Sequence, residues 1–394
     1  MKYLLLRLKR FCGFATGFIF FISGILKVLD PVGAGLVMSE YLDFLHLGFL
    51  KFASKLSGTA FAFAEIVIGT GLITGIFRKA FAITAFAFQA FFTILTLLLV
   101  IFNPSMDCGC FGEAIHLSHM QTFVKNLVLL ALLAIYTFPI RMFGANKRRK
   151  YVSFSIVTAS ALAFTIYSWL YIPLTDFTVY KPGAALEALE MAEESENERY
   201  EAVFIYEKDG VQERFDLGHL PDTTWTYVGT EMQTKEGFKD DQLMSLSFCN
   251  TEEEYLDSLA ANGKVMVVSV YDTDIKAARW EELYGFMEKA KECGFRPLLL
   301  VATTPDQIGG EIPDFMYFSD YKTLITMNRS NGGATYFSNG YLIRKWARRS
   351  LPDMKELMDF YKADETETII DQDTRGSLTL QGFLLYVFAV MLLL

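Results

Sequence analysis

Long apolar runs alternate with short polar segments in the first part of the chain, and one more apolar run closes it. Each run holds about 18 to 22 mostly apolar residues, which as a helix can cross about 30 Å of hydrocarbon. The six runs lie at 11–29, 56–77, 80–102, 120–140, 152–172 and 377–394. This pattern predicts six transmembrane helices.

After residue 172 the pattern changes to short apolar stretches separated by polar turns. Residues 200–206 and 211–217 flank a Glu-Lys-Asp-Gly turn, which predicts a β-hairpin. Strand, helix, strand, extended piece, helix, hairpin and helix are then expected at 265–271, 275–293, 296–303, 315–319, 321–327, 334–346 and 351–361. Such an order predicts a soluble α/β domain.

The composition is that of a membrane protein joined to an acidic soluble part. Hydrophobic residues make up 52% of the 394 positions, and the chain has 36 Phe, which is more apolar than a soluble protein of this length. Residues 1–172 carry 15 Lys and Arg against 6 Asp and Glu, whereas residues 173–394 carry 21 against 39. The net charges of +9 and −18 predict two physically different regions. We expect no nucleic-acid partner.

Cationic loops predict the orientation in the membrane, because loops rich in Lys and Arg stay in the cytoplasm. Such loops precede the first span and follow the second and the fourth, with Lys2, Arg7, Lys9, Arg10, Arg78, Lys79, Arg141, Lys147, Arg148, Arg149 and Lys150. The intervening loops, 30–55 and 103–118, are poorer in cations. We therefore expect a multi-pass protein of the bacterial inner membrane, with both termini cytoplasmic and residues 173–376 periplasmic. A cleaved signal peptide is the alternative for the first run.

Two cysteines one residue apart, Cys108 and Cys110, follow the third span on the predicted outer side. A disulfide between them would close a small, strained ring, which is reduced more easily than a relaxed structural bridge. Gly109 gives the backbone the freedom that such a ring needs. Asp107 and Glu113 disfavour a very low thiol pKa nearby. The pair is a candidate catalytic dithiol, and a structural clip or two idle thiols are the alternatives.

The same loop offers a metal site as an alternative. Cys108, Cys110, His116 and His119 place four ligands within twelve residues, enough for a Cu(I) or Zn(II) ion. Their spacing differs from the common zinc patterns. Ser118 before His119 is equally typical of a helix N-cap. The main interpretation is therefore a site without metal.

Ionisable residues inside a span are costly and persist where they are paired or functional. Glu65 lies in the second span, about a third of its length from the outer side. Helix rise places it near the depth of Lys27 and Lys125, both expected towards the outer leaflet. Glu65 with one of these lysines is a candidate proton relay or contact for a quinone-like acceptor. A structural ion pair is the alternative.

In combination, these residues resemble a known family. The motifs are Ser23-Gly24-x-x-Lys27 ending in Asp30-Pro31, Glu65 followed by Gly69, Gly71 and Gly75, and Asp107-Cys-Gly-Cys-Phe-Gly112. With them, residues 8–140 resemble the DoxX/MauE group of four-helix membrane proteins, and the whole chain resembles a two-part variant from Gram-negative envelopes. The resemblance implies an association with periplasmic thiol–disulfide chemistry. For MauE this is maturation of a disulfide-rich methylamine dehydrogenase subunit, and for DoxX relatives it is redox or sulfur metabolism.

The element order over about 251–362 resembles thioredoxin, but the catalytic residues of that fold are missing. A thioredoxin carries Cys-x-x-Cys at the first strand-to-helix junction, where this chain has Tyr271-Asp-Thr-Asp-Ile-Lys276. The place of the cis-proline is taken by Asn331-Gly-Gly-Ala-Thr335. We therefore expect a degenerate thioredoxin-like domain that binds or positions something. Cys249 and Cys293 are a candidate structural disulfide, since this compartment permits oxidation.

The predicted fold class is thus a membrane α-helical part, a four-helix DoxX/MauE-like bundle plus two further transmembrane helices, with an α/β thioredoxin-like soluble domain that lacks the catalytic CxxC. The boundaries are 1–150 for the four-helix domain, 151–172 for the fifth helix, 173–250 for a juxtamembrane linker and β-rich segment, 251–364 for the degenerate domain and 377–394 for the last helix.

The predicted function is periplasmic thiol–disulfide exchange through Cys108 and Cys110, with Glu65 in a supporting role, as in a thiol–disulfide oxidoreductase. The expected partners are the lipid bilayer and a periplasmic thiol or disulfide protein, and a quinone is a candidate cofactor. The alternative is a non-enzymatic scaffold or assembly factor whose cysteine pair is structural. Copper or zinc binding at the Cys/His loop is a lesser alternative.

Overall fold

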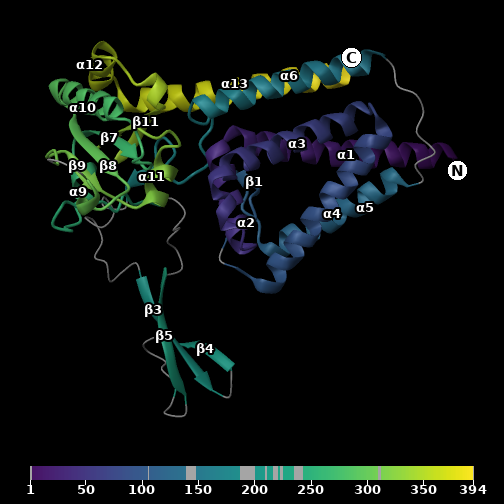
Figure 1. Ribbon diagram of the computed structural model, residues 1–394, viewed down its shortest axis with the longest axis horizontal. Helices are drawn as coiled ribbons and strands as arrows, with labels where there is room; N and C mark the ends of the chain where they lie inside the picture. The colour runs from purple at the N-terminus through teal and green to yellow at the C-terminus, as the bar shows by residue number, and fades with distance from the viewer. Residues whose placement is uncertain are drawn as a thin grey trace.

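Long helices fill one part of the molecule, and a β-sheet flanked by helices fills another (Figure 1). The structure is a computed structural model that describes residues 2–104, 106–138, 148–186, 200–208, 211–215, 221, 225–234, 243–308 and 312–393. Within these ranges six helices are long and apolar enough to span a membrane, as the apolar runs predicted. Both termini lie at the end of the helical part that is remote from the sheet (Figure 1). Arg141 and Lys147 lie outside the described residues.

Two helix pairs build the first part of the bundle. Helix α1 (Lys2–Leu29) packs along α3 (Ser54–Thr74), and α4 (Arg78–Phe102) packs along α5 (His119–Thr137). A side chain at Gly24 would lie 2.6 Å from the backbone oxygen of Ala62, so this glycine lets α1 and α3 approach closely.

The remaining two long helices lie alongside each other although they are far apart in the sequence (Figure 1). They are α6 (Arg148–Leu170) and α13 (Glu365–Leu393), and the Ser153 hydroxyl donates to the Val390 carbonyl at 2.8 Å. Helix α13 begins before position 377, the predicted start of the last span.

The segment between the first two spans, expected to be a loop, contains a further helix. Helix α1 ends at Leu29, and Asp30 then caps α2 (Pro31–Phe44) by accepting a hydrogen bond from the Gly33 amide at 2.9 Å. Pro31 occupies the first helical position, where its missing N–H costs nothing. Helix α2 was not predicted from the sequence because its apolar residues are spread around the helix and do not form one apolar face. The short 3₁₀ helix η1 (Gly48–Ala53) then leads into α3.

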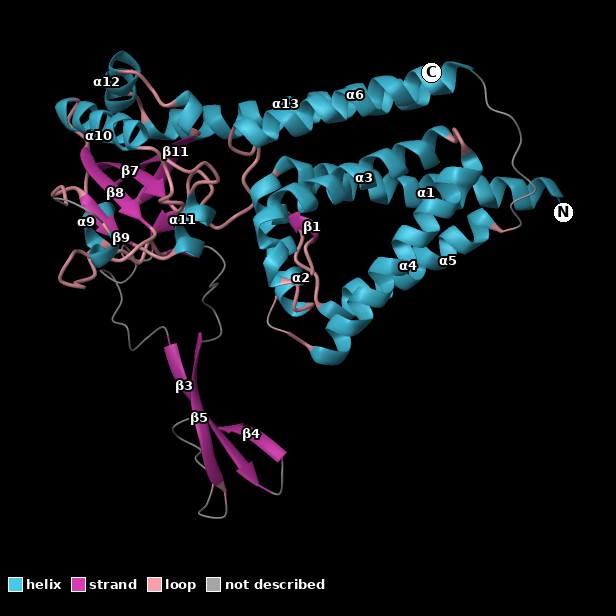
Figure 2. Cartoon of the chain, viewed as in Figure 1, coloured by secondary structure: helices cyan, strands magenta, loops and turns pink. Residues whose placement is uncertain are grey.

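The predicted dithiol lies where the chain returns from α4 to α5. A short strand, β1 (Cys110–Glu113), lies against α1 and α2 at the end of the bundle nearer the sheet (Figure 2). Ser118 and Gln121 then form a capping box that starts α5, as expected for an N-cap serine.

Three parallel strands at one end of the sheet adjoin a hairpin. Strands β7 (Lys264–Val270), β8 (Arg296–Val301) and β9 (Met316–Phe318) are parallel. Strand β10 (Gly333–Ser338) pairs antiparallel with β7 and turns back into β11 (Tyr341–Trp346). With β2 (Ala185–Leu186) and β6 (Leu243–Met244) the order is β6-β2-β11-β10-β7-β8-β9.

Helices cover both faces of this sheet. Helices α10 (Ala277–Glu292) and α12 (Met354–Lys362) contribute buried residues to the core on one face. Helices α9 (Ser258–Ala261) and α11 (Tyr321–Met327) contribute to the core on the other face. Short 3₁₀ turns occur at η4 (Pro305–Gln307) and η5 (Arg348–Ser350). This is the expected α/β domain, whereas its relation to thioredoxin stays a prediction.

A separate three-stranded antiparallel sheet lies between β2 and β6 in the chain. It has the order β4-β3-β5. The predicted hairpin forms β3 (Tyr200–Lys208) and β4 (Val211–Phe215), and β5 (Thr226–Thr234) pairs with the free edge of β3.

Candidate functional site

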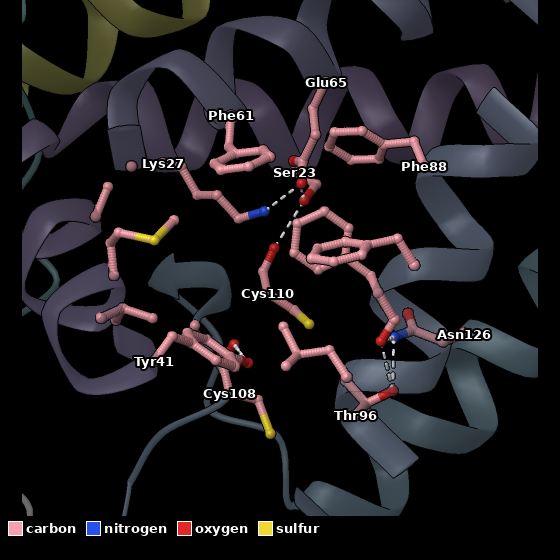
Figure 3. Close-up of a pocket in the computed structure, with 18 of the residues that line it drawn as sticks. Ser23, Lys27, Tyr41, Phe61, Glu65, Phe88, Thr96, Cys108, Cys110 and Asn126 are labelled. Carbon is pink, nitrogen blue, oxygen red and sulfur yellow. Dashed lines mark hydrogen bonds and ion pairs between the residues drawn. The ribbon is translucent and has the colours of Figure 1, made fainter. Parts of the chain in front are cut away.

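An apolar cavity of about 230 Å³ opens in the helical part beside the cysteine loop. Helices α1 to α5 and residues 108–112 line it, with several Phe rings among the walls (Figure 3). Leu45, Phe61 and Phe91 belong to this lining and are also exposed on the protein surface. Phe61 and Phe91 lie on helices long and apolar enough to span a membrane, and exposed apolar side chains of a spanning helix face lipid, so this wall of the cavity lies at the lipid-facing surface.

Hydroxyl groups from two helices hold the backbone of the cysteine loop. The Tyr41 hydroxyl donates to the Cys108 carbonyl at 3.0 Å, and the Ser23 hydroxyl lies 2.7 Å from the Cys110 carbonyl. Between them Gly109 has a φ of +58°, and a Cβ there would collide with Val37. The position thus requires glycine for both reasons.

The two thiols of this loop occupy different environments. Both are free thiols, but Cys108 is buried, with 5% of its surface exposed, whereas Cys110 is partly exposed. The sulfur of Cys110 lies among the side chains that line the cavity, while Cys108 lies beside Tyr41 (Figure 3). Any incoming thiol or small molecule therefore meets Cys110 before Cys108.

Burial raises the pKa of the Cys108 thiol, and two neighbours from α5 oppose this rise. The Thr122 hydroxyl and the positive charge of Lys125 both favour the thiolate form of Cys108. The Thr122 hydroxyl is buried and has no hydrogen-bond partner among the described residues, so it is available to donate to a thiolate at Cys108. Both groups stabilise the charged sulfur that appears when a disulfide at Cys108 opens.

A chain of polar contacts crosses the cavity wall from Lys27 to the cysteine loop. The Lys27 ammonium contacts Glu65 Oε1 at 2.5 Å, and Glu65 Oε2 lies 2.8 Å from the Ser23 hydroxyl. That hydroxyl has one proton but two acceptors within reach, the Glu65 carboxylate and the Cys110 carbonyl. The chain can therefore rearrange when a proton arrives or leaves (Figure 3).

This geometry explains the Ser-Gly-x-x-Lys motif residue by residue. Ser23 and Lys27 bind the two oxygens of Glu65, and Gly24 between them lets α3 come close enough to present that carboxylate. Of the two lysines that were candidates to pair with Glu65, the structure selects Lys27. Lys125 lies instead over the Phe111 ring, 4.8 Å from its centre.

The alternative set of metal ligands is not brought together. The two ring nitrogens of His119 lie 3.3 Å from Asn103 Oδ1 and 2.9 Å from the Met106 carbonyl. His116 is exposed beside Asp107. No group of three or more His, Cys, Asp or Glu within the described ranges is arranged to hold a metal ion. The proximity of these residues in sequence therefore does not translate into a metal-binding geometry.

Cys249 and Cys293 lie in the α/β domain as two free thiols. The backbone of Cys249 bridges to Phe318, whereas the Cys293 thiol lies 3.7 Å from the Met354 carbonyl. A disulfide between them stays a prediction without support from this geometry.

The sequence analysis missed two residues of the site. Tyr41 was missed together with helix α2, on which it lies. Thr122 reads as an ordinary polar residue of a span, although a buried hydroxyl without a partner is unusual enough to suggest a role. The signal that could have found it is its position one helical turn after the Ser118 cap, next to the cysteine loop.

Comparison with known proteins gives matches to parts of the chain. Residues 2–139 match the family described as Methylamine utilisation protein MauE, and residues 200–236 match a domain of unknown function, DUF8463. Protein TlpB of Flavobacterium psychrophilum is 26% identical over 174 residues, which are 41% of this chain and 45% of that protein. The aligned part thus spans about half the length of that relative.

No solved structure matches the chain. The MauE match covers the helices that build the cavity and the cysteine loop, and it agrees with the MauE side of the expected resemblance. The chain is therefore a multi-pass membrane protein whose N-terminal part is similar to MauE.

Proposed function

We propose that this protein is a thiol–disulfide oxidoreductase that works at the membrane surface through Cys108 and Cys110. The observation that carries the proposal is the loop itself. A partly exposed thiol and a buried thiol, two residues apart, lie at the wall of a cavity at the lipid-facing surface. The MauE similarity of this region is in line with the redox association that the motifs imply.

The different exposure of the two thiols divides their roles. A thiolate of the partner protein attacks the Cys110 sulfur of the Cys108–Cys110 disulfide, because Cys110 is the accessible one. A mixed disulfide forms at Cys110, and Cys108 leaves as a thiolate that Thr122 and Lys125 stabilise. The second thiol of the partner then attacks the mixed disulfide. The partner has lost two electrons and two protons, and Cys108 and Cys110 have gained them.

Reoxidation of the dithiol requires an acceptor of two electrons and two protons, and a membrane quinone fits the cavity. An engineered cavity of about 150 Å³ can hold benzene, so about 230 Å³ has room for a substituted ring. The tail of a quinone would leave past the lipid-facing side chains. A bound quinone would supply the oxidising equivalents for Cys108 and Cys110 to close to a disulfide.

Proton transfer in this step falls to the polar chain on the cavity wall. Both thiols must lose a proton when the disulfide forms, and the reduced acceptor must gain two. Glu65 lies between Lys27 and Ser23, and Ser23 contacts the Cys110 backbone. We assign Glu65 the role of a proton carrier within this chain, with Lys27 setting its charge.

The location of the reaction follows from the loop charges. Cationic residues favour the cytoplasm, so the cysteine loop and the α/β domain are assigned to the periplasmic side of the inner membrane. The order β11-β10-β7-β8, with β10 antiparallel, supports the thioredoxin-like assignment of that domain. Its proposed task is to position the dithiol and its protein partner.

The test is disulfide trapping in intact membranes. In a Cys108→Ser variant the Cys110 thiolate can attack the disulfide of the oxidised partner, the reverse of the step above, and no Cys108 thiol is present to resolve the product. A mixed disulfide with the partner protein should therefore accumulate, whereas Cys110→Ser should not form it. Both variants should lose exchange activity by at least about a hundred-fold. Cys249→Ser and Cys293→Ser serve as matched controls and should retain activity.

Two results would overturn this proposal in favour of a non-enzymatic scaffold whose cysteine pair is structural. The first is a cysteine pair that keeps one redox state under every physiological reductant and oxidant. The second is a Cys108→Ser, Cys110→Ser double variant that retains the wild-type phenotype.

A further inference from the structure

One arginine of the α/β domain reaches across to the helical part. Arg329 follows helix α11, and its side chain is only 5% exposed. Its Nη1 donates to the Ile325 carbonyl of its own domain at 3.2 Å. The other two nitrogens bind carboxylates that lie 299 and 216 positions away in the chain.

These carboxylates belong to the segments around the cysteine loop. Arg329 Nε contacts Asp30 Oδ2 at 2.9 Å, and Arg329 Nη2 contacts Glu113 Oε1 at 3.0 Å. Burial disfavours the charge of the guanidinium, but the two carboxylates outweigh it and the pKa of Arg329 is raised. Buried, charge-assisted hydrogen bonds of this kind are stronger than those between neutral groups.

Each carboxylate controls one support of the dithiol. Asp30 caps helix α2, and Tyr41 on that helix holds the Cys108 carbonyl. Glu113 ends strand β1, which begins at Cys110. Arg329 therefore connects the α/β domain to the start of α2, which holds the loop through Tyr41, and to β1, which continues from the loop.

We propose that Arg329 is a positioning residue that fixes the dithiol loop when the α/β domain is docked on the helical part. Release of Arg329 frees the end of β1 and the start of α2, and the loop then exposes Cys110. The consequence for turnover rests on the proposed function, whereas the effect on exposure does not. In this way the soluble domain sets the state of the dithiol without a thiol of its own at the end of β7.

A second ion pair in the same interface provides a matched control. Lys345 on β11 contacts Asp176 at 2.6 Å, and their side chains are 5% and 14% exposed, the same values as for Arg329 and Asp30. This pair ties the α/β domain to the segment after α6. It involves neither α2 nor β1.

The experiment compares Arg329→Gln with Lys345→Gln in the full-length protein, reconstituted in lipid nanodiscs with all thiols reduced. The alkylation rate of Cys110 is measured by tandem mass spectrometry, which separates it from Cys108. Arg329→Gln should raise this rate by about five-fold or more, the lower end of typical coupling between sites. It should also shift the midpoint potential of the dithiol. Lys345→Gln should leave both quantities within about two-fold of wild type.

Two milder variants keep the proposal testable if Arg329→Gln does not fold. Asn is as good an N-cap as Asp, so Asp30→Asn removes the charge but keeps the cap of α2. Glu113→Gln releases only β1. Each should give a smaller increase in Cys110 alkylation than Arg329→Gln.

Equal changes in the Arg329 and Lys345 variants, or no change in either, would overturn the positioning role. The measurement uses reduced thiols, so it does not depend on redox cycling. A wild-type pair that never cycles, but whose alkylation responds to Arg329, would refute the proposed function and leave this inference standing.

Discussion

The end of strand β7 and the cysteine loop are two turns that the molecule supports in opposite ways. At the end of β7 the Asn331 side chain accepts hydrogen bonds from the amides of Tyr271 and Asp272, at 2.8 Å and 3.1 Å, and donates to the Asp272 carbonyl at 2.8 Å. The cysteine loop is held by the hydroxyls of Tyr41 and Ser23, which come from two distant helices.

This difference indicates where chemistry can be controlled. At the end of β7 the single side chain of Asn331 satisfies the amides of Tyr271 and Asp272 and the Asp272 carbonyl, which leaves none of these groups for a ligand. A loop held by side chains from several elements changes its geometry whenever one of those elements moves. The end of β7 is thus a turn fixed by one side chain, whereas the geometry of the cysteine loop depends on two helices.

The largest effect is expected at the buried ion pair of the helical part. Lys27→Met leaves the Glu65 carboxylate buried without its cation, which should cost about 3–5 kcal/mol of stability. The double variant Lys27→Met, Glu65→Leu should recover most of that stability, because no unpaired charge remains. Its reoxidation by a soluble quinone analogue should nevertheless fall by about a hundred-fold, the scale of a lost proton carrier.

Thermal unfolding in detergent and the rate of quinol formation separate these two effects. The exposed pair Lys51 and Asp43, with side chains 48% and 52% exposed, is the control, and its removal should change stability by less than about 1 kcal/mol. If the double Lys27, Glu65 variant reoxidises at the wild-type rate, the ion pair stabilises the fold and takes no part in proton transfer.

A smaller effect is expected from adding one methyl group to each region. Gly109→Ala places a Cβ against Val37 on a backbone with a φ of +58°, so it should cost about 1–2 kcal/mol and slow exchange by about ten-fold. Gly285 lies within α10 with no atom near its missing side chain, so Gly285→Ala should stabilise the α/β domain by about 1 kcal/mol.

Denaturant unfolding and the exchange rate measure both glycine variants. If Gly109→Ala exchanges as fast as wild type, the loop does not need its left-handed turn for the reaction. The positive φ of Gly109 would then matter for packing against Val37 and not for thiol–disulfide exchange.

Local patterns were enough to predict the six spanning helices, the β3–β4 hairpin and strands β7 to β11, but not β1, β2 or β6. Spans of apolar residues predict helices because lipid leaves the backbone no other partners, and the alternation around residues 207–210 predicts the β3–β4 hairpin. Helix α2 escaped prediction because only its cap, Asp30-Pro31, has a local signature, and that pair also marks the end of a helix.

The candidate site was predictable only in part, since most of it depends on contacts between distant segments. The cysteines and Glu65 stood out by residue type alone. The choice of Lys27 over Lys125 depends on which way each helix faces, and the link from Arg329 to Asp30 joins positions 299 residues apart. The histidines were close to the cysteines in sequence, but their ring nitrogens face Asn103, Met106 and Asp107 instead.

The smallest effect concerns the protonation of Cys108 and is separated from packing by its pH dependence. Thr122→Val removes the hydroxyl that favours the thiolate, so the pKa of Cys108, already raised by burial, should rise further. Only the thiolate reacts, so alkylation of Cys108 near pH 8 should slow by about three- to ten-fold. The two proteins should converge as the pH passes both pKa values, because each is then fully ionised.

Thr93→Val is the control for the loss of a buried hydroxyl, because the Thr93 hydroxyl donates to the Gln89 carbonyl of its own helix at 2.7 Å. It should leave the pH profile of Cys108 unchanged. A Thr122→Val profile that is lower by the same factor at every pH would point to restricted access instead of a changed pKa. The Thr122 hydroxyl would then control access to the buried thiol and would not stabilise its charge.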